Sequence, residues 1–402
     1  MTFKKMETIE AKYLDTNQKG RVIGHIEGTI PGPLVFFFAG IHGNEPAGVI
    51  ALQNTLNRLE ERKNQIRGKI YGLVGNLPAL AAKKRFIDED LNRVWTTNRI
   101  SQLKLKENLM VEEKEMLELL TFIQNILDTN QEPVYFIDFH TTSSKTYPFI
   151  TINDALINRK FAMQFPVPIV LGIEEYLEGP MLSYVNQKGF VGIGFEAGQH
   201  QEEAAVRHTE AFIYLTLRFT GAIKKKHMPD WKQHYQVLEA SAAELHKIFE
   251  IVHLHKIGDL DRFKMLPGFE SFQVIHQGTD LAYHNHETIK SPYNGRIFMP
   301  LYQSQGSDGF FIIHRIPYWA LKLSAFLRKL KIDNLLPLLP GVSWEHKDKM
   351  VLKVNLKKAR FFAKPFFHLF GYRIRVQEGE WLRLSNRERV AKRNMYRWER
   401  WY

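Results

Sequence analysis

Three largely apolar runs mark the first part of the chain. The runs cover residues 33–40, 69–76 and 133–140. Such runs are typical of strands that are buried on both faces of a sheet. After the first run, Pro46 stands where the first turn of a helix tolerates a missing N–H, and residues 48–61 have apolar positions at helical spacing. This alternation predicts an α/β fold with a mostly parallel or mixed sheet flanked by helices.

The pattern changes at about residue 250, where short β-like pieces are separated by Gly and Pro turns. After residue 320, Lys and Arg alternate with Trp, Tyr and Phe. These changes predict three parts: an α/β domain over residues 1–248, a smaller β subdomain over 249–319, and a basic, aromatic-rich C-terminal extension over 320–402.

Composition narrows the chemistry that is available. The chain has 402 residues, of which 44% are hydrophobic, and this is enough to bury a large core. It has no cysteine, which excludes disulfides, a thiolate nucleophile and zinc–thiolate sites. Any metal must therefore be bound by histidine and carboxylate side chains.

The formal charge of +12 is concentrated in the extension, because residues 320–402 contain 20 Lys and Arg against 7 Asp and Glu. The rest of the chain is close to neutral, so nucleic acid is not an expected partner. A basic segment rich in aromatic residues can contact an anionic membrane or an acidic partner. The alternative, which we favour, is a folded element whose aromatic side chains lie in a core. The oligomeric state is not predicted.

Neither secretion nor membrane insertion is indicated by the hydropathy of the chain. The N-terminal segment, MTFKKMETIEAKYLD, has no apolar region ahead of its first charges. No run elsewhere reaches the ~18 apolar residues of a membrane-spanning helix. We therefore expect a soluble, cytoplasmic protein.

The first candidate chemistry is His42 and Glu45, which have the spacing H-x-x-E. The spacing alone is not specific, because His200 with Glu203 shares it. The first pair, however, directly follows a buried strand and is flanked by glycines that allow side chains to converge in a tight loop. Ligands gather at such strand ends in α/β sheets. The alternative of a solvated loop with a capping Glu stays open at this point.

A third metal ligand can come from His140, at the end of another apolar run. Asp138 lies two residues before it, on the same face of the strand, where it can support an imidazole. Two histidines and one carboxylate are the ligand set of a catalytic zinc site. A histidine that merely ends a strand is the alternative.

The segment RFIDEDLNRVW, residues 85–95, contains Arg85, Asn92 and Arg93. An Arg side chain binds a carboxylate through two parallel hydrogen bonds, so Asn92 and Arg93 can form a clamp for an anionic substrate. A charged, solvated turn is the alternative interpretation.

Four sequence blocks together resemble the aspartoacylase and succinylglutamate desuccinylase family. They are GIHGNEPAG, NLPAL with RFIDEDLNR, DFHTTSS and GIGFEAGQ, and they follow the family's order across residues 40–200. The resemblance implies a zinc-carboxypeptidase-like catalytic domain with a C-terminal β subdomain that contributes to the mouth of the site. It also implies one zinc ion per chain, held by His42, Glu45 and His140.

The resemblance further assigns roles to residues outside the metal site. It implies that Glu196 is the general base, that Arg85 polarises the scissile carbonyl, and that Asn92 and Arg93 hold the substrate's α-carboxylate. A tyrosine that closes the site in the family is matched here by Tyr302.

The function implied is a zinc-dependent hydrolase that cleaves the amide bond of a small N-acyl amino acid. A carboxypeptidase-like peptidase or peptide amidase shares the zinc and Glu196 but needs a longer groove. A third interpretation is a non-catalytic adaptor that acts through its basic extension.

One departure from the family concerns the substrate. Aspartoacylases place an Arg and a Tyr shortly before the catalytic Glu to bind a second carboxylate. Here no Arg occurs between Arg159 and Arg207, and Lys188 and Tyr184 are the nearby substitutes. An amino acid with a neutral or differently placed side chain is therefore at least as well matched as acylaspartate, and the acyl group is not fixed by the sequence.

Overall fold

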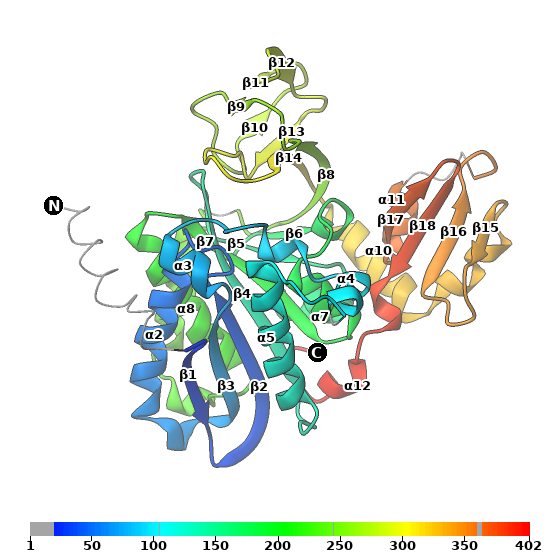
Figure 1. Cartoon of the computed structure of the whole chain (residues 1–402). Coiled ribbons are helices and arrows are strands. Elements are labelled where there is room, and N and C mark those ends of the chain that lie inside the picture. The colour runs from blue at the N-terminus through cyan, green and yellow to red at the C-terminus, as the bar shows by residue number, and fades with distance from the viewer. Residues whose placement is uncertain (1–19, 104, 244, 360–363) are drawn as a thin grey trace.

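A large mixed β-sheet is the main structural element in the computed structural model, which describes residues 20–402 apart from 104, 244 and 360–363 (Figure 1). Within the described residues the sheet has eleven strands. In spatial order they are β1 (Val22–Glu27), β3 (Arg67–Val74), β2 (Ile30–Ala39), β4 (Val134–Thr142), β7 (Val191–Gln199), β5 (Phe149–Ile152), β6 (Ile169–Leu171), β8 (Ile248–Lys256), β14 (Asp308–Arg315), β13 (Gly295–Phe298) and β10 (Val274–Ile275).

The central strands β3, β2, β4 and β7 are parallel, whereas β1 and β5 pair antiparallel with their neighbours β3 and β7. Strand β2 shows why its apolar run is continuous. Val35 and Phe37 pack on one side of the sheet and Phe36 and Phe38 on the other, and all four are buried. The predicted α/β fold with a mixed sheet is confirmed.

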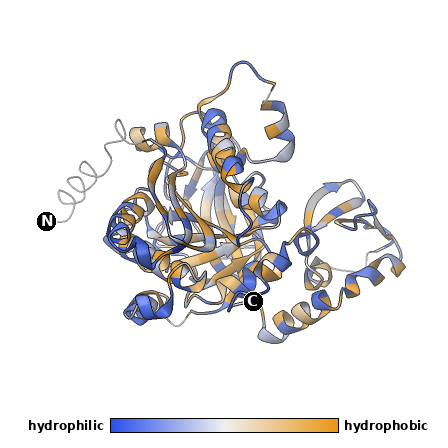
Figure 2. Ribbon diagram, turned by 90° about the horizontal axis from the view of Figure 1, so that it is seen from below, coloured by the Kyte–Doolittle hydropathy of each residue, from blue (hydrophilic) through white to orange (hydrophobic). Residues whose placement is uncertain are grey.

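Helices cover both faces of the sheet (Figure 1). Their outer surfaces are largely hydrophilic, whereas the enclosed strands are hydrophobic (Figure 2). One face is covered by α2 (Ala47–Glu60), α6 (Leu156–Ala162), α8 (Glu203–Phe219) and α9 (Trp231–Ser241). The other is covered by α4 (Thr97–Leu103), α5 (Val111–Leu127) and α7 (Met181–Gln187). Shorter helical segments are α3 (Leu77–Ala82), η1 (Lys63–Gln65), η2 (Leu91–Arg93), η3 (Ile173–Glu175) and η4 (Lys225–His227).

The region after residue 248 continues the main sheet. Strand β8 pairs in parallel with β6 and antiparallel with β14, so the sheet runs on through β14, β13 and β10. A second, three-stranded sheet packs nearby and consists of β12 (Glu287–Lys290), β11 (Asp280–His284) and β9 (Phe263–Met265). No pattern in the chain predicts that strands on both sides of residue 248 share one sheet.

The C-terminal extension has a hydrophobic cluster of its own, built around Leu352, Phe367 and Tyr372. Its elements are α10 (Tyr318–Lys329), η5 (Ile332–Leu338), β15 (Val342–Trp344), β16 (Val351–Asn355), α11 (Lys364–Leu369), β17 (Tyr372–Glu378), β18 (Trp381–Asn386), η6 (Arg387–Arg389) and α12 (Arg393–Tyr396). After α12 the chain returns to the main body, where Tyr396 and Trp401 join the core beside α6. Aromatic side chains of the extension thus lie in two cores.

A buried carboxylate joins the extension to the main body. Asp154 is completely buried and contacts three arginines at 2.7–2.9 Å, namely Arg159, Arg328 and Arg373. Arg328 lies in α10 and Arg373 in β17, so two of the three cations come from the extension. Burial opposes ionisation of Asp154, but these ion pairs outweigh it and hold the pKa of the carboxyl well below its usual value.

Among the residues described, no helix combines the length and the apolar character needed to cross a membrane.

Candidate metal and catalytic site

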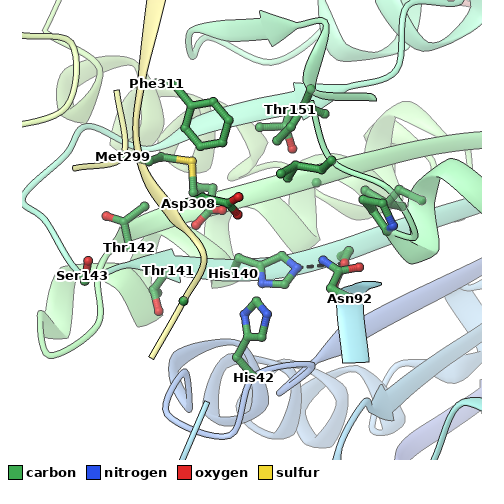
Figure 3. Close-up of a pocket in the computed structure, with 18 of the residues that line it drawn as sticks. His42, Asn92, His140, Thr141, Thr142, Ser143, Thr151, Met299, Asp308 and Phe311 are labelled. Carbon is green, nitrogen blue, oxygen red and sulfur yellow. Dashed lines mark hydrogen bonds and ion pairs between the residues drawn. The ribbon is translucent and has the colours of Figure 1, made fainter. Parts of the chain in front are cut away.

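His42, Glu45 and His140 converge at the carboxyl ends of β2 and β4. One potential ligand atom from each lies within 4.8 Å of those of the other two, and all three residues are nearly inaccessible to solvent. The loop that carries His42 and Glu45 packs tightly, because a Cβ at Gly43 would lie 2.0 Å from the backbone of Ala79. Figure 3 shows the rings of His42 and His140 side by side at the base of the pocket.

Both imidazoles present Nδ1 to the same carboxylate. Nδ1 of His42 lies 2.7 Å from Oε1 of Glu45, and Nδ1 of His140 lies 3.2 Å from Oε2. The backbone N–H of Thr141 donates to Oε2 as well, which fixes the Glu45 side chain. Burial opposes ionisation of Glu45, but the two histidines outweigh it and hold its pKa well below the usual value, so the carboxylate is anionic at neutral pH.

The outer nitrogens of the two imidazoles are also held by carboxylates. Nε2 of His140 lies 2.8 Å from Asp138, and Nε2 of His42 lies 3.2 Å from Asp90. A carboxylate behind each histidine is the usual support of a metal-bound imidazole. The donor set of two Nδ1 atoms and one carboxylate therefore fits a divalent cation such as zinc.

Arg85 lies beside the cluster and is largely enclosed. Its Nη2 donates to Asp90 at 3.0 Å, and its Nη1 lies 3.6 Å from Glu45. Asp90 thus orients both Arg85 and His42. Burial opposes the charge of the guanidinium, but Asp90 and Glu45 outweigh it and raise its pKa, so Arg85 is a permanent cation facing the cluster.

Glu196 lies in β7, directly opposite His140 in the parallel register of β4 and β7. The residue is buried, and its Oε2 has no hydrogen-bond partner among the described residues. Burial raises the pKa of Glu196, which is the shift that desolvation of an acid produces. A buried carboxylate with a free oxygen next to a cation site is suited to accept and return a proton.

One pocket is lined by His42, Asp138, His140 and Glu196 together with Arg85, Asn92 and Arg93. Opposite the polar end its wall is mostly apolar and includes Ile152, Ile173, Leu177, Leu182, Met299 and Phe311. Met299 and Phe311 come from the region after residue 248, as does Asp308 (Figure 3).

The predicted clamp residues both line the pocket, but each also has a partner in the protein. The side-chain oxygen of Asn92 accepts from the backbone N–H of Met181, at the start of α7. Arg93 donates to the carbonyl of Asn92 and to Asp308, the latter at 2.6 Å. Asp308 therefore fixes the guanidinium and adds an anion beside the predicted clamp.

Tyr302, predicted to contact the substrate, lies outside the lining of this pocket. Its hydroxyl donates to the carbonyl of Leu266 and accepts from the N–H of Phe269. Its neighbours Leu301 and Gln303 line the pocket, whereas Tyr302 lines an adjoining pocket that also includes His200 and Gln303. The phenol of Tyr302 thus holds the segment of Leu266 and Phe269.

The two proposed substitutes for the missing arginine also lie outside the described lining of the pocket. Tyr184 is buried against Trp95, and Lys188 lies over the ring of Tyr184. Neither supplies a cation to the pocket, so a second carboxylate of a substrate has no counterpart there.

Three residues of the site were not singled out from the sequence: Asp90, which contacts His42 and Arg85, and the pocket residues His200 and Asp308. Asp90 lies in the same block as Asn92, and this proximity was an available signal. His200 contacts Thr141 and Gln303, and burial lowers its pKa, so it is a neutral polar group of the wall. Asp308 lies 215 positions from Arg93, and no local pattern connects the two.

The fold and the cluster define an α/β protein with a candidate metal centre at the ends of parallel strands. Residues 31–219 match the family described as the succinylglutamate desuccinylase/aspartoacylase catalytic domain. Residues 31–219, slightly less than half of the chain, are therefore assigned to this family.

Individual relatives agree with this assignment. A succinylglutamate desuccinylase of Photorhabdus laumondii is 35% identical over 89 residues, which cover 22% of this chain and 26% of that protein. The match to this relative thus spans about a quarter of its length. Among solved structures, a succinylglutamate desuccinylase/aspartoacylase from Rhodobacter sphaeroides has a TM-score of 0.54 at 15% identity and covers 73% of this chain and 88% of its own. A succinylglutamate desuccinylase from Vibrio cholerae has a TM-score of 0.53 at 14% identity, with 76% and 94% covered. The structural likeness shows the shared fold.

Proposed function

We propose that this protein is a zinc-dependent deacylase that hydrolyses the amide bond of a small N-acyl amino acid. The observation that carries the proposal is the position of Glu196, which has an unpartnered oxygen and lines the same pocket as His42 and His140 of the cluster. Residues 1–248 are proposed as the catalytic domain. Residues 249–319 are proposed to close its mouth, since Met299 and Asp308 line the pocket.

The metal would be held by His42, Glu45 and His140. When bound, zinc supplies Lewis acidity to a carbonyl oxygen and to water. The protein's own contribution is to orient the two imidazoles, through Asp138 behind His140 and Asp90 behind His42.

Two residues carry the proton and charge changes of the reaction. Glu196 accepts a proton from the attacking water and delivers it to the departing amine, so that one group acts as base and then as acid. The fixed guanidinium of Arg85 stabilises the negative charge that develops on the carbonyl oxygen. Because the pocket is largely enclosed by protein, this interaction is stronger than it would be in water.

The pocket favours a substrate with one carboxylate. Among the described residues, the basic side chains that line the pocket are Arg85 and Arg93. Each of them is already paired with an aspartate. We propose that Asn92 and Arg93 bind the α-carboxylate. A second carboxylate would meet Asp308 and the apolar wall. The substrate class is therefore an N-acyl amino acid with a neutral side chain and an acyl group without a terminal carboxylate.

A panel of paired substrates tests this proposal. N-acetylasparagine and N-acetylaspartate differ by one charge, and we expect kcat/KM to be at least about tenfold higher for the neutral member, because like charges in a desolvated site cost several kcal/mol. Asp308→Asn should reduce that difference. Release of free amine from short peptides but not from acyl amino acids would favour the peptidase alternative, and no amine release at all would favour the non-catalytic one.

Metal content is a separate prediction. Purified protein should contain about one zinc per chain, and His140→Ala should lose most of it, because a site with three protein ligands is left with two. Elemental analysis by mass spectrometry gives the stoichiometry, and circular dichroism checks that the variant is folded. His346→Ala, at an exposed histidine, is the control. Equal zinc content in both variants would exclude His140 as a ligand.

A further inference from the structure

Helix α10 partly reverses the usual polarity of a surface helix, although its Leu327 packs against the hydrophobic cluster of the extension. The side that faces the protein buries Ser324 and Arg328, whereas Trp319, Leu323 and Phe326 face outward. Trp319 and Phe326 are 67% and 57% exposed. Buried polar and exposed large apolar side chains are the informative exceptions to the normal distribution of residues.

The reversal has a structural cause. Arg328 must point inward to pair with Asp154, and both side chains are fully buried in this contact. Residues 319, 323, 326 and 330 recur at the spacing of one helix face, and this face lies away from Arg328. The apolar stripe is therefore held outward by the same ion pair that attaches the extension.

Exposed apolar side chains continue along the neighbouring segment. Leu338, in η5, is 80% exposed. The exposed large hydrophobic residues of segment 318–338 are Tyr318, Trp319, Leu323, Phe326, Leu330, Leu335 and Leu338. Single exposed apolar residues are ordinary, but a concentration of this kind marks an interaction surface.

The exposed charged side chains of segment 318–338 are all positive, since its one acidic residue, Asp333, is buried. Lys322, Lys329 and Lys331 are exposed, and residues 309–332 contain no Asp or Glu. The stripe lies in the lobe that α10 forms with the sheet β15–β18, to the right of the main body in Figure 1. The partner must therefore combine an apolar interior with a negative surface.

We propose that the outward face of α10 docks on an anionic lipid bilayer, lying in the plane of the interface. Trp, Phe and Leu on one side of a helix with lysines beside them match the composition of interfacial helices. Tryptophan and tyrosine prefer the headgroup level, and the lysines attract anionic headgroups. A second copy of the chain fits less well, because it would bring lysines against lysines.

Vesicle sedimentation with the full chain tests the proposal. The protein should sediment with phosphatidylcholine vesicles that contain about 30 mol% phosphatidylglycerol, and much less with pure phosphatidylcholine, because the lysines add electrostatic attraction. Trp319→Ser combined with Phe326→Ser should lower the bound fraction about tenfold or more, since the inserted apolar area is lost. Lys322→Glu with Lys329→Glu should abolish the preference for the anionic lipid.

Leu260→Ser is the matched control, because Leu260 is 98% exposed in the β subdomain, outside the extension. It should bind as the unchanged protein does. The proposal is overturned if anionic vesicles do not bind the protein, or if the Trp319 and Phe326 changes leave binding unaltered. It is also overturned if light scattering shows a dimer in solution that the same two changes dissociate, since the stripe would then be covered by a second copy.

Discussion

Glu196→Gln is expected to lower kcat by about 10²- to 10⁴-fold, the usual contribution of general acid–base catalysis. Gln nearly preserves the shape of the side chain but cannot accept a proton from water or return one to the departing amine. The loss corresponds to ~3–5 kcal/mol of the activation barrier. The fold should not suffer, because the Oε2 of Glu196 has no partner to lose among the described residues. Steady-state kinetics with the best acyl amino acid of the panel gives the value.

The control is Glu203→Gln, at an exposed glutamate in the first turn of α8. Zinc content and melting temperature are measured for both variants. If the Glu196 variant keeps its zinc and turns over within about threefold of the unchanged protein, Glu196 does not act as the base.

The metal cluster was accessible from the sequence because His42 and Glu45 follow one buried strand and His140 lies near the end of another. A continuous apolar run identifies such a strand, and parallel strands bring their carboxyl ends to one edge of the sheet. His42 and His140 therefore had to lie near each other once β2 and β4 were adjacent, as the structure shows. The assignment of Glu196 depended on the family resemblance, because its local sequence has no distinctive spacing.

Contacts between distant segments were not accessible in this way. The pairing of Arg93 with Asp308 depends on how β14 returns beside the pocket, and no periodicity encodes that path. The position of Tyr302 away from the pocket has a related cause. Its phenol is held by the backbone of Leu266 and Phe269, and no local pattern connects these residues.

The extension shows what amino-acid composition alone does not predict. Interleaved basic and aromatic residues predicted either a folded element or a surface for an anionic partner. The structure contains features of both, because Tyr396 and Trp401 are buried in the main core whereas Trp319 is exposed. A basic, aromatic-rich sequence is compatible with both a buried and an exposed position. Only the tertiary contacts distinguish the two.

Asp154 connects the C-terminal extension to the wall of the pocket. It follows Asn153, which lines the pocket and donates to Ser183. Its carboxylate contacts Arg328 and Arg373 of the extension. The ion pairs therefore hold one wall of the pocket in place from the far side.

Asp154→Asn is expected to destabilise the protein by ~3–5 kcal/mol, because removing one partner of a buried ion pair leaves an uncompensated charge. Here three guanidinium groups, those of Arg159, Arg328 and Arg373, would surround a neutral amide. Urea unfolding at neutral pH gives the change as a shift in midpoint, and Asp259→Asn, at an exposed aspartate, should not shift it.

The dependence on pH provides an independent check of the same contact. Because the folded-state pKa of Asp154 is held well below its usual value, its contribution is fully present above about pH 4 and is lost as the pH falls toward the folded-state pKa. The difference in unfolding free energy between the unchanged protein and the Asp154→Asn variant should therefore be constant from neutral pH down to about pH 5 and should shrink below about pH 4. A midpoint that does not move at neutral pH would show that the three arginines are solvated, and the extension would then be attached mainly through Tyr396 and Trp401. If the midpoint moves and KM rises as well, the extension stabilises the wall that contacts the substrate.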